Sequence, residues 1–295
     1  MDLTVPLPFQ IAIYAFIALS ILTSVLKIRV TTPYVSILNR WFRWFGISFG
    51  GAFLVFEAGW FYRPYWSLAV VGFLLWFLIE TVYNWLAVSA LSQSSFALFP
   101  SFVENTSGEE WPASKRSLKL RDWLRQNKFK KIQALTSDLG NGLLLRSSVY
   151  EDVNRKIRIQ ILFIPQSGGA MGYSFSFTSE TEDGVKFVTD NLYVPYGGFY
   201  PENWNISRNP WVSDIHKLFC KHKDRIQNKD IILWEESPLL DLNEQQKLLE
   251  RINVKEGFLL PYHLQEEQGR ISYDGRYRVW KEIWFINYLG IFPKH

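Results

Sequence analysis

Long apolar runs occupy the first third of the chain and set it apart from the rest. The segment 4–26 carries no charged side chain, and the runs 44–62 and 66–91 carry one acid each. A helix needs about 20 apolar residues to cross the ~30 Å hydrocarbon layer of a bilayer. The pattern therefore predicts three transmembrane helices, and the short connection 63–65 makes the last two a hairpin.

The hydrophobic pattern changes after about residue 113. A helix is predicted to begin at Ser114, whose hydroxyl suits an N-cap. Short runs rich in β-branched and aromatic residues then alternate with turn residues, which predicts strands. These runs cover 131–137, 143–150, 156–164, 172–179 and 186–193. Within 173–177 aromatic residues alternate with serines, so we expect one face of the sheet to be core and the other wet.

Helical spacing returns towards the C-terminus, over about 212–225, 243–253 and 277–289. The chain is therefore predicted to be α+β, with a five-stranded antiparallel meander followed by helices. The expected organisation is a transmembrane unit over 1–95, a linker over 96–113 and a soluble domain over 114–295.

Charge is distributed unevenly and suggests a membrane topology. Four cations, Lys27, Arg29, Arg40 and Arg43, lie between the first two predicted spans, and a basic run follows the third. Cationic loops are retained on the cytoplasmic side, so we expect the N-terminus outside and the soluble domain in the cytoplasm, at an inner or plasma membrane. Cys220 is the only cysteine and requires no oxidising compartment.

Polar and small residues inside the predicted spans are candidates for function. Buried acids in a membrane normally face protein, water or a partner, which singles out Glu57 and Glu80. Tyr83 and Asn84 share a helical face with Glu80, where they could bind an ion or join helices. Small residues permit close helix packing, either within one chain or in a homo-oligomer. The strip consists of Gly46, Gly50 and Gly51.

The helix predicted at Ser114 is strongly basic. A cationic amphipathic helix near a span is attracted to anionic lipids, and a solvated basic face on the domain surface is the alternative. The net charge of the chain is only +4, which gives little reason to expect nucleic acid as a partner. The cations proposed to meet the lipid bilayer are Lys115, Arg116, Lys119, Arg121, Arg125 and Lys128.

A loop over 193–211 is packed with aromatic residues, glycines and prolines. Such a loop can cradle a ligand or touch a membrane, and it can also close the end of a sheet as part of the core. The candidate residues are Tyr196, Phe199, Tyr200 and Trp204.

No catalytic constellation emerges from the sequence, and we expect neither a metal nor another cofactor. His216 and Cys220 are the closest approach to a metal pair, but the chain has only 4 histidines. The leading hypothesis is a membrane-anchored cytosolic binding module. The alternatives are an enzyme acting on a lipid or membrane-bound substrate, and an oligomeric channel or transport accessory.

Overall fold

The computed structural model describes residues 5–29, 33–107, 111–140, 142–165 and 171–292. Thr4, the first residue of the predicted first span, lies outside these ranges. The chain divides into two compact units. The helical unit comprises the chain up to Ala90 together with Tyr277–Phe292, and the sheet unit comprises Leu91–Arg276.

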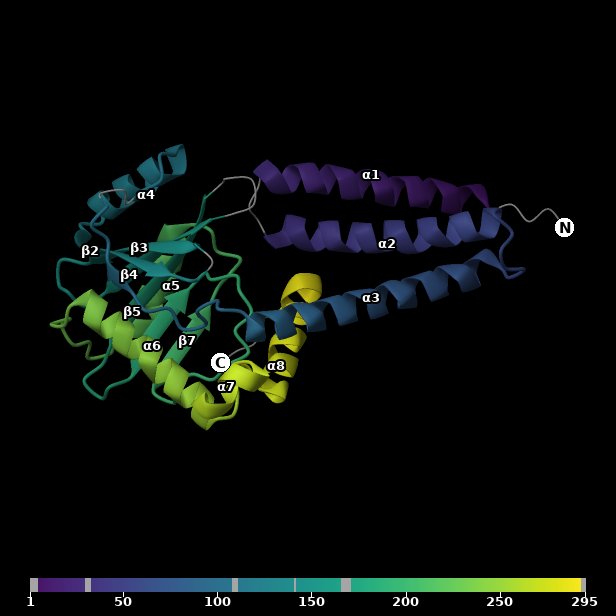
Figure 1. The fold of residues 1–295 in the computed structure, drawn as a ribbon. Coiled ribbons are helices and arrows are strands. Elements are labelled where there is room, and N and C mark those ends of the chain that lie inside the picture. Colours follow the sequence, from purple (N-terminus) through teal and green to yellow (C-terminus); the bar gives the residue numbers. More distant parts are fainter. Residues whose placement is uncertain (1–4, 30–32, 108–110, 141, 166–170, 293–295) are drawn as a thin grey trace. The chain divides into compact units, whose positions relative to one another are not determined.

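Three long helices begin the helical unit: α1 (Leu7–Arg29), α2 (Pro33–Glu57) and α3 (Tyr65–Gln93) (Figure 1). Two described helices, α1 over Leu7–Lys27 and α3, are long and apolar enough to cross a membrane. The prediction of three spans is therefore supported for two. The run 44–62 is not one helix, because α2 begins earlier, contains Arg40 and Arg43, and ends at Glu57.

A buried amide joins the first two helices. The Asn39 side chain of α2 donates to the Ser20 carbonyl at 2.9 Å, to Thr23 Oγ1 at 2.9 Å and to Ser24 Oγ at 2.8 Å, all on α1. Satisfying a polar group in this way avoids the cost of burying it unpaired. The contact fixes the register between α1 and α2.

The C-terminal segment belongs to the helical unit, although the sequence suggested that it is part of the soluble domain. Helix α8 (Tyr273–Trp284) continues into the π-helical turn η1 (Phe285–Leu289). The Tyr288 ring stacks on Trp284 with centroids 4.5 Å apart and meets the edge of Trp44 at 5.4 Å. Trp41 Nε1 also donates to the Tyr288 carbonyl at 2.9 Å. These aromatic contacts hold the segment against α2.

A seven-stranded sheet organises the second unit, with the strands in sequence order. All neighbours are antiparallel except β6 and β7, which are parallel. The strands are β1 (Val103–Glu104), β2 (Lys130–Asp138), β3 (Leu144–Glu151), β4 (Arg158–Pro165), β5 (Met171–Glu180), β6 (Lys186–Asp190) and β7 (Trp204–Arg208). The predicted α+β class is confirmed. The five-stranded meander corresponds to β2–β6, and both edge strands were missed.

Four helices complete the unit: α4 (Lys115–Gln126), α5 (Ile215–Ile226), α6 (Pro238–Lys255) and α7 (Tyr262–Gln268). Ser114 caps α4 as predicted, because its hydroxyl accepts from the Ser117 amide at 3.1 Å. Asp214 caps α5 by accepting from the His216 amide at 2.8 Å. Helix α7 has no counterpart in the sequence prediction.

The two faces of the sheet are covered by different helices (Figure 1). What we term the apolar face packs against α4 and α5 in one core. Its buried strand residues include Ile159, Ile161, Phe163, Phe175 and Phe177. What we term the polar face carries the alternate side chains and is covered by α6. These side chains include Arg158, Gln160, Ser176, Thr178 and Lys186.

Candidate ligand site on the polar face of the sheet

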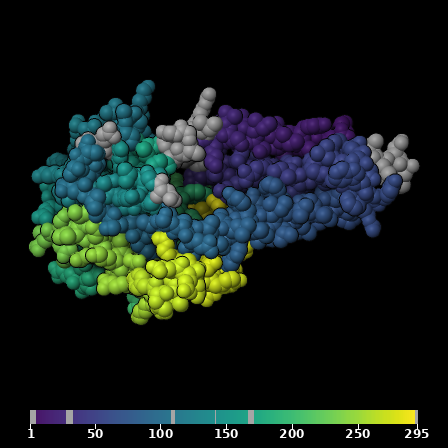
Figure 2. Space-filling view, in the orientation of Figure 1, coloured from purple at the N-terminus to yellow at the C-terminus, as the bar shows by residue number. Residues whose placement is uncertain are grey.

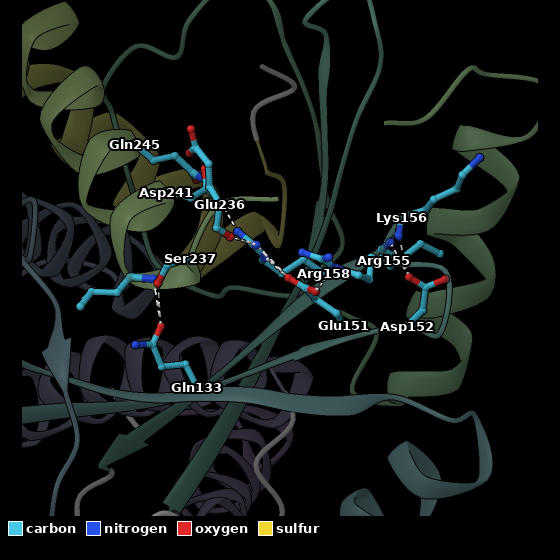
Figure 3. A network of polar contacts seen from close by, with 12 residues as sticks. Gln133, Glu151, Asp152, Arg155, Lys156, Arg158, Glu236, Ser237, Asp241 and Gln245 are labelled. Carbon is cyan, nitrogen blue, oxygen red and sulfur yellow. Dashed lines mark hydrogen bonds and ion pairs between the residues drawn. The ribbon is translucent and has the colours of Figure 1, made fainter. Parts of the chain in front are cut away.

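A chain of alternating charges crosses the polar face, and Figure 3 shows its members Glu151, Arg158 and Asp241. Arg158 donates to Glu151 Oε1 from Nε at 3.0 Å and from NH2 at 2.8 Å, and to Asp241 Oδ2 from NH1 at 2.7 Å. Lys186 Nζ lies 3.2 Å from Asp241 Oδ1 and 3.5 Å from Glu180 Oε2. We call these five residues the charge chain. Its members Glu151, Arg158, Asp241 and Lys186 are buried.

Strand register and helix position explain why these charges meet. Glu151 and Arg158 are cross-strand partners in β3 and β4, and Glu180 and Lys186 are partners in β5 and β6. Opposite charges in directly facing positions stabilise a strand pair. Asp241 lies in the first turn of α6, where the helix dipole favours a carboxylate. It therefore bridges Arg158 of β4 and Lys186 of β6, two strands that are separated by β5.

The start of α6 is fixed by contacts with the sheet and with the segment before the helix (Figure 3). Gln133 Oε1 of β2 accepts from the Leu239 amide at 3.1 Å. Arg158 NH2 donates to the Glu236 carbonyl at 2.8 Å. The position of Asp241 is thus set by the backbone around it as well as by its own ion pairs.

Aromatic rings shield the two cations of the charge chain. The Arg158 guanidinium carbon lies 4.2 Å from the centroid of Trp234, and Lys186 Nζ lies 5.5 Å from the same ring. Lys186 also lies 5.7 Å from the centroid of Trp204. Cation–π contacts are stronger when the cation is removed from water, as both are here.

Two neighbouring hollows lie beside the charge chain, between the sheet and α6. The larger has a volume of about 770 Å³ and is lined by Lys186 and Asp241 of the charge chain, and by Trp204 and Gln245. The narrower has a volume of about 140 Å³ and reaches Gln160 on β4. Both hollows share Trp204, Asp241 and Gln245, and we treat them together as the polar-face cavity. Small-molecule sites typically occupy about 300–1,000 Å³.

The outer side of α6 is at the surface, where its light-green spheres form part of Figure 2. Glu244, Lys247 and Arg251 are exposed on it and line the rim of the larger hollow. The polar-face cavity is consequently buried on the sheet side and open along one edge of α6.

Some polar atoms near the cavity have no hydrogen-bond partner within the described ranges. They are Gln160 Nε2, Ser147 Oγ and Trp234 Nε1, all buried and all on or beside the polar face. Natural proteins leave few buried polar atoms unsatisfied, and such atoms call for a specific explanation. Gln160 lines the narrower hollow, while its Nε2 atom is itself buried from that hollow.

Two ionisable groups next to the parallel strand pair have shifted pKa values. Burial raises the pKa of Asp190 on the polar face, opposed by Arg208, which lies 3.3 Å away. Burial lowers the pKa of His222 to about 3, with Arg225 acting in the same direction. His222 lies on the apolar face, where Thr189 and Ser179 hydrogen-bond its two ring nitrogens at 2.9 and 3.1 Å. It is a neutral structural residue at physiological pH.

The predicted aromatic loop reaches the polar-face cavity at Asn203 and Trp204. Tyr196 stacks on Tyr200 with centroids 4.5 Å apart, and Tyr200 stacks on Trp204 at 6.2 Å. Trp204 is the first residue of β7 and lines both hollows. The Phe199 amide donates to Asn253 Oδ1 at 2.8 Å, which ties the loop to α6. Part of the predicted loop is therefore a strand, and its ring stack ends at the cavity.

The predicted membrane-surface helix is α4. Its apolar side chains Leu120 and Leu124 are buried in the core of the apolar face. They are consequently not free to enter a bilayer, and the outward charges and the exposed Leu118 remain for lipid. Arg116 lies 5.2 Å from the Tyr173 ring centroid. The exposed cations are Lys115, Lys119, Arg121, Arg125 and Lys128.

The polar residues of the predicted spans do not form one cluster. Glu80 Oε1 lies 3.4 Å from Arg43 NH2, and the Glu80 side chain is 12% exposed. Asn84 is buried, whereas Tyr83 is 67% exposed on the helix surface. Glu57 is exposed at the end of α2.

The glycine strip of α2 divides between two surroundings. A methyl group at Gly46 would lie 3.6 Å from Ile17, and one at Gly50 would lie 3.8 Å from Ile13, so both glycines face α1. A methyl group at Gly51 would meet no atom of the described residues within 4 Å. The strip therefore supports packing within one chain at two of its three positions.

The candidate metal pair lies on the surface of α5. His216 Nε2 and Cys220 Sγ are 3.7 Å apart and exposed. Among the described residues no three His, Cys, Asp or Glu side chains come together as metal ligands.

Comparison of the chain with protein-family models finds no match, and comparisons with curated proteins and with solved structures find no significant similarity. Sequence reasoning missed the charge chain and the cavity. The available signal was the polar pair Arg158 and Gln160, which alternates with Ile159 and Ile161 in a strand that is central to the sheet.

Proposed function

We propose that this protein is a membrane-anchored binding module whose soluble domain holds a small polar ligand in the polar-face cavity. The observation that carries the proposal is the polar-face cavity itself, with a charge chain buried along its wall. Buried ion pairs contribute little to stability compared with apolar residues of similar size. Retaining them beside a cavity of ligand size favours a binding role.

The membrane part of the proposal extends the two apolar helices to three spans, with α2 as the third. Its Arg40 and Arg43 would then lie near the cytoplasmic boundary, together with Lys27 at the end of α1. Positive charge at these positions supports a cytoplasmic soluble domain. The exposed cations of α4 add a surface that anionic lipid headgroups attract, at ~1 kcal/mol for each cation close to the bilayer.

The exposed Cys220 provides a test of topology. A membrane-impermeant thiol reagent should leave Cys220 unlabelled in intact cells and label it after lysis, with Cys220→Ser as the blank. Labelling before lysis would place the domain outside and reject the cytoplasmic part of the proposal.

Blocking the cavity provides the test of binding. Thr178 lines the narrower hollow, so Thr178→Trp fills part of it, and the exposed Thr106→Trp is the matched control. The full chain in lipid nanodiscs is incubated with a small-molecule cell extract, and hydrogen exchange is measured along α6. We expect protection of α6 in the wild type and in Thr106→Trp but not in Thr178→Trp. Equal protection in all three proteins would reject the cavity as the binding site.

A further inference from the structure

We propose that the ligand of the polar-face cavity is an uncharged, hydroxyl-rich ring such as a saccharide. The inference rests on the proposed function and specifies its ligand class. It follows from three properties of the cavity: its balance of charge, its mixture of donors and acceptors, and the aromatic side chains that border it.

The charge of the lining is balanced. The two hollows together are lined by four carboxylates and four cations. They are Glu180, Asp241, Glu244 and Glu250 against Arg158, Lys186, Lys247 and Arg251. A ligand with a net charge would disturb this balance.

The buried cations are already engaged by carboxylates. Lys186 contacts Asp241 and Glu180, and Arg158 contacts Glu151 and Asp241. An anionic ligand that reached these buried cations would have to displace one of the carboxylates, which would leave a buried charge without its partner. Breaking a buried pair in this way is strongly destabilising. The buried side of the cavity therefore disfavours phosphates and carboxylates.

The remaining polar groups offer both donors and acceptors. Carboxylates only accept, the Lys186 ammonium only donates, and amide side chains do both. A hydroxyl donates and accepts and can rotate its hydrogen to suit either partner. Several hydroxyls on one ring can therefore form hydrogen bonds with both the donors and the acceptors of the cavity lining. The amide nitrogens of Asn203 and Gln245 already donate to the Gly184 carbonyl and to Asp241. The neutral polar residues of the lining are Gln160, Ser176, Thr178, Asn203, Gln245 and Gln246.

Gln160 is a specific candidate for a hydrogen bond to a ligand hydroxyl. Its Nε2 is buried without a hydrogen-bond partner in the described parts of the chain, and the residue lines the narrower hollow. A ligand hydroxyl oxygen placed in the hollow would accept from Nε2 once the Gln160 side chain turns this buried atom towards it. Gln160 is consequently the residue at which ligand class and binding geometry can be tested together.

Aromatic side chains complete the lining. Trp204 lines both hollows, and Tyr262 lines the larger one with 57% of its surface exposed. An aromatic side chain combines a large apolar surface with a polar edge, so it suits a ring whose C–H groups are apolar and whose substituents are polar.

The test uses the full chain in nanodiscs of phosphatidylcholine and phosphatidylglycerol, prepared without any sugar-headed detergent. The uncharged probes are maltose, trehalose and adenosine, and the charged probes are AMP and spermidine. Calorimetry at low and high salt measures affinity, and hydrogen exchange reports the site. A second nanodisc preparation that contains digalactosyldiacylglycerol distinguishes a lipid-borne sugar from a free one.

We expect at least one uncharged probe, or the galactolipid, to protect α6, with an affinity that changes by less than about twofold with salt because no charge is screened. Gln160→Leu should weaken this binding roughly tenfold through loss of a buried hydrogen bond, and the exposed Gln126→Leu should not.

The contrary outcomes separate the two proposals. Binding of AMP or spermidine alone, salt-dependent and weakened by Gln160→Leu, would reject the ligand class and retain the cavity as the site. Failure of every uncharged probe and of the galactolipid to bind also overturns the ligand class. Binding that neither Gln160→Leu nor Thr178→Trp affects would place the site elsewhere and overturn both proposals.

Discussion

The two faces of the sheet are both covered by helices, yet they differ in chemistry. On β5, Phe175 and Phe177 are fully buried against α4 and α5. Ser176 and Thr178, which alternate with them along the strand, line a hollow under α6. The same alternation that builds the core on one side therefore builds a polar cavity on the other. A helix that covers a face of a sheet therefore does not by itself turn that face into an apolar core.

The difference implies that the two faces contribute differently to the stability of the fold. Burying apolar area stabilises a fold by roughly 25 cal/mol per Å², so the apolar face is the main source of stability. On the polar face, Arg158, Asp241 and Lys186 are removed from water and compensated mainly by one another. We expect substitutions on the two faces to differ in size and in sign, and the following predictions test this expectation.

The largest effect is expected from Phe175→Ala on the apolar face. The side chain is completely buried in the core, so truncation removes its transfer free energy and leaves a cavity. The expected loss of stability is ~3–5 kcal/mol. Hydrogen exchange of the β5 amides measures it as a free energy of opening, and Ser176→Ala on the opposite side of the strand should change it by less than ~0.5 kcal/mol. Similar losses for both variants would refute the division between the faces.

A somewhat smaller loss is expected when the charge chain is broken at its centre. Asp241→Asn leaves Arg158 and Lys186 without the carboxylate that both contact, at a cost of about 3 kcal/mol. The exposed Asp183→Asn is the matched control. Hydrogen exchange at the start of α6 should show the loss first, because Asp241 lies in its first turn. A change below about 1 kcal/mol would show that the charge chain is solvated.

The apolar face could be predicted from sequence because its signal is local. Short runs rich in aromatic and β-branched residues identified β2–β6, and the alternation of aromatic residues with serines identified the side of β5 that forms the core. Ser114 and the apolar residues after it likewise identified α4. These features depend on spacing within a few residues, and hydrophobic burial follows from them directly.

The polar face could not be predicted because its chemistry depends on distant pairing. Arg158 and Asp241 are 83 residues apart, and only the fold brings them to 2.7 Å. The serines of β5 read as a solvent face, since nothing in the local pattern shows that α6 covers them. Strand β7 was missed because it has few β-branched residues and follows a loop rich in proline and glycine, and only pairing with β6 makes it a strand.

A pH-dependent effect is expected from His222 on the apolar face. Its pKa is about 3 in the folded chain, against an ordinary value of 6.5, so below pH 6.5 the unfolded chain binds a proton that the folded chain does not. Stability is therefore complete above pH 6.5 and falls as the pH decreases towards 3, by about 2 kcal/mol at pH 5.

The slope is measured by comparing β5 opening energies at pH 7 and pH 5. Since buried carboxylates also contribute in acid, the informative quantity is the difference between wild type and His222→Gln, which should show the shallower slope. The exposed His216→Gln should retain the wild-type slope. Identical slopes in all three proteins would mean that His222 is charged in the fold.

The smallest effect, and the only one expected to have the opposite sign, comes from Gln160→Leu on the polar face. The amide nitrogen of Gln160 is buried without a partner in the described residues, so the folded chain bears the cost of removing it from water. Leucine has a similar size, removes that cost and adds apolar contact beside Leu242 and Leu249, which line the same hollow. We expect an unchanged or increased stability, by up to about 1 kcal/mol, in the opening energy of β4 amides.

The apolar-face substitution Ile161→Gln on the same strand is the reciprocal control, because it buries an unpaired amide in the core and should destabilise by more than about 2 kcal/mol. If Gln160→Leu instead destabilises the ligand-free protein by about 2 kcal/mol or more, the Gln160 amide already serves the fold, and its availability to a ligand is refuted.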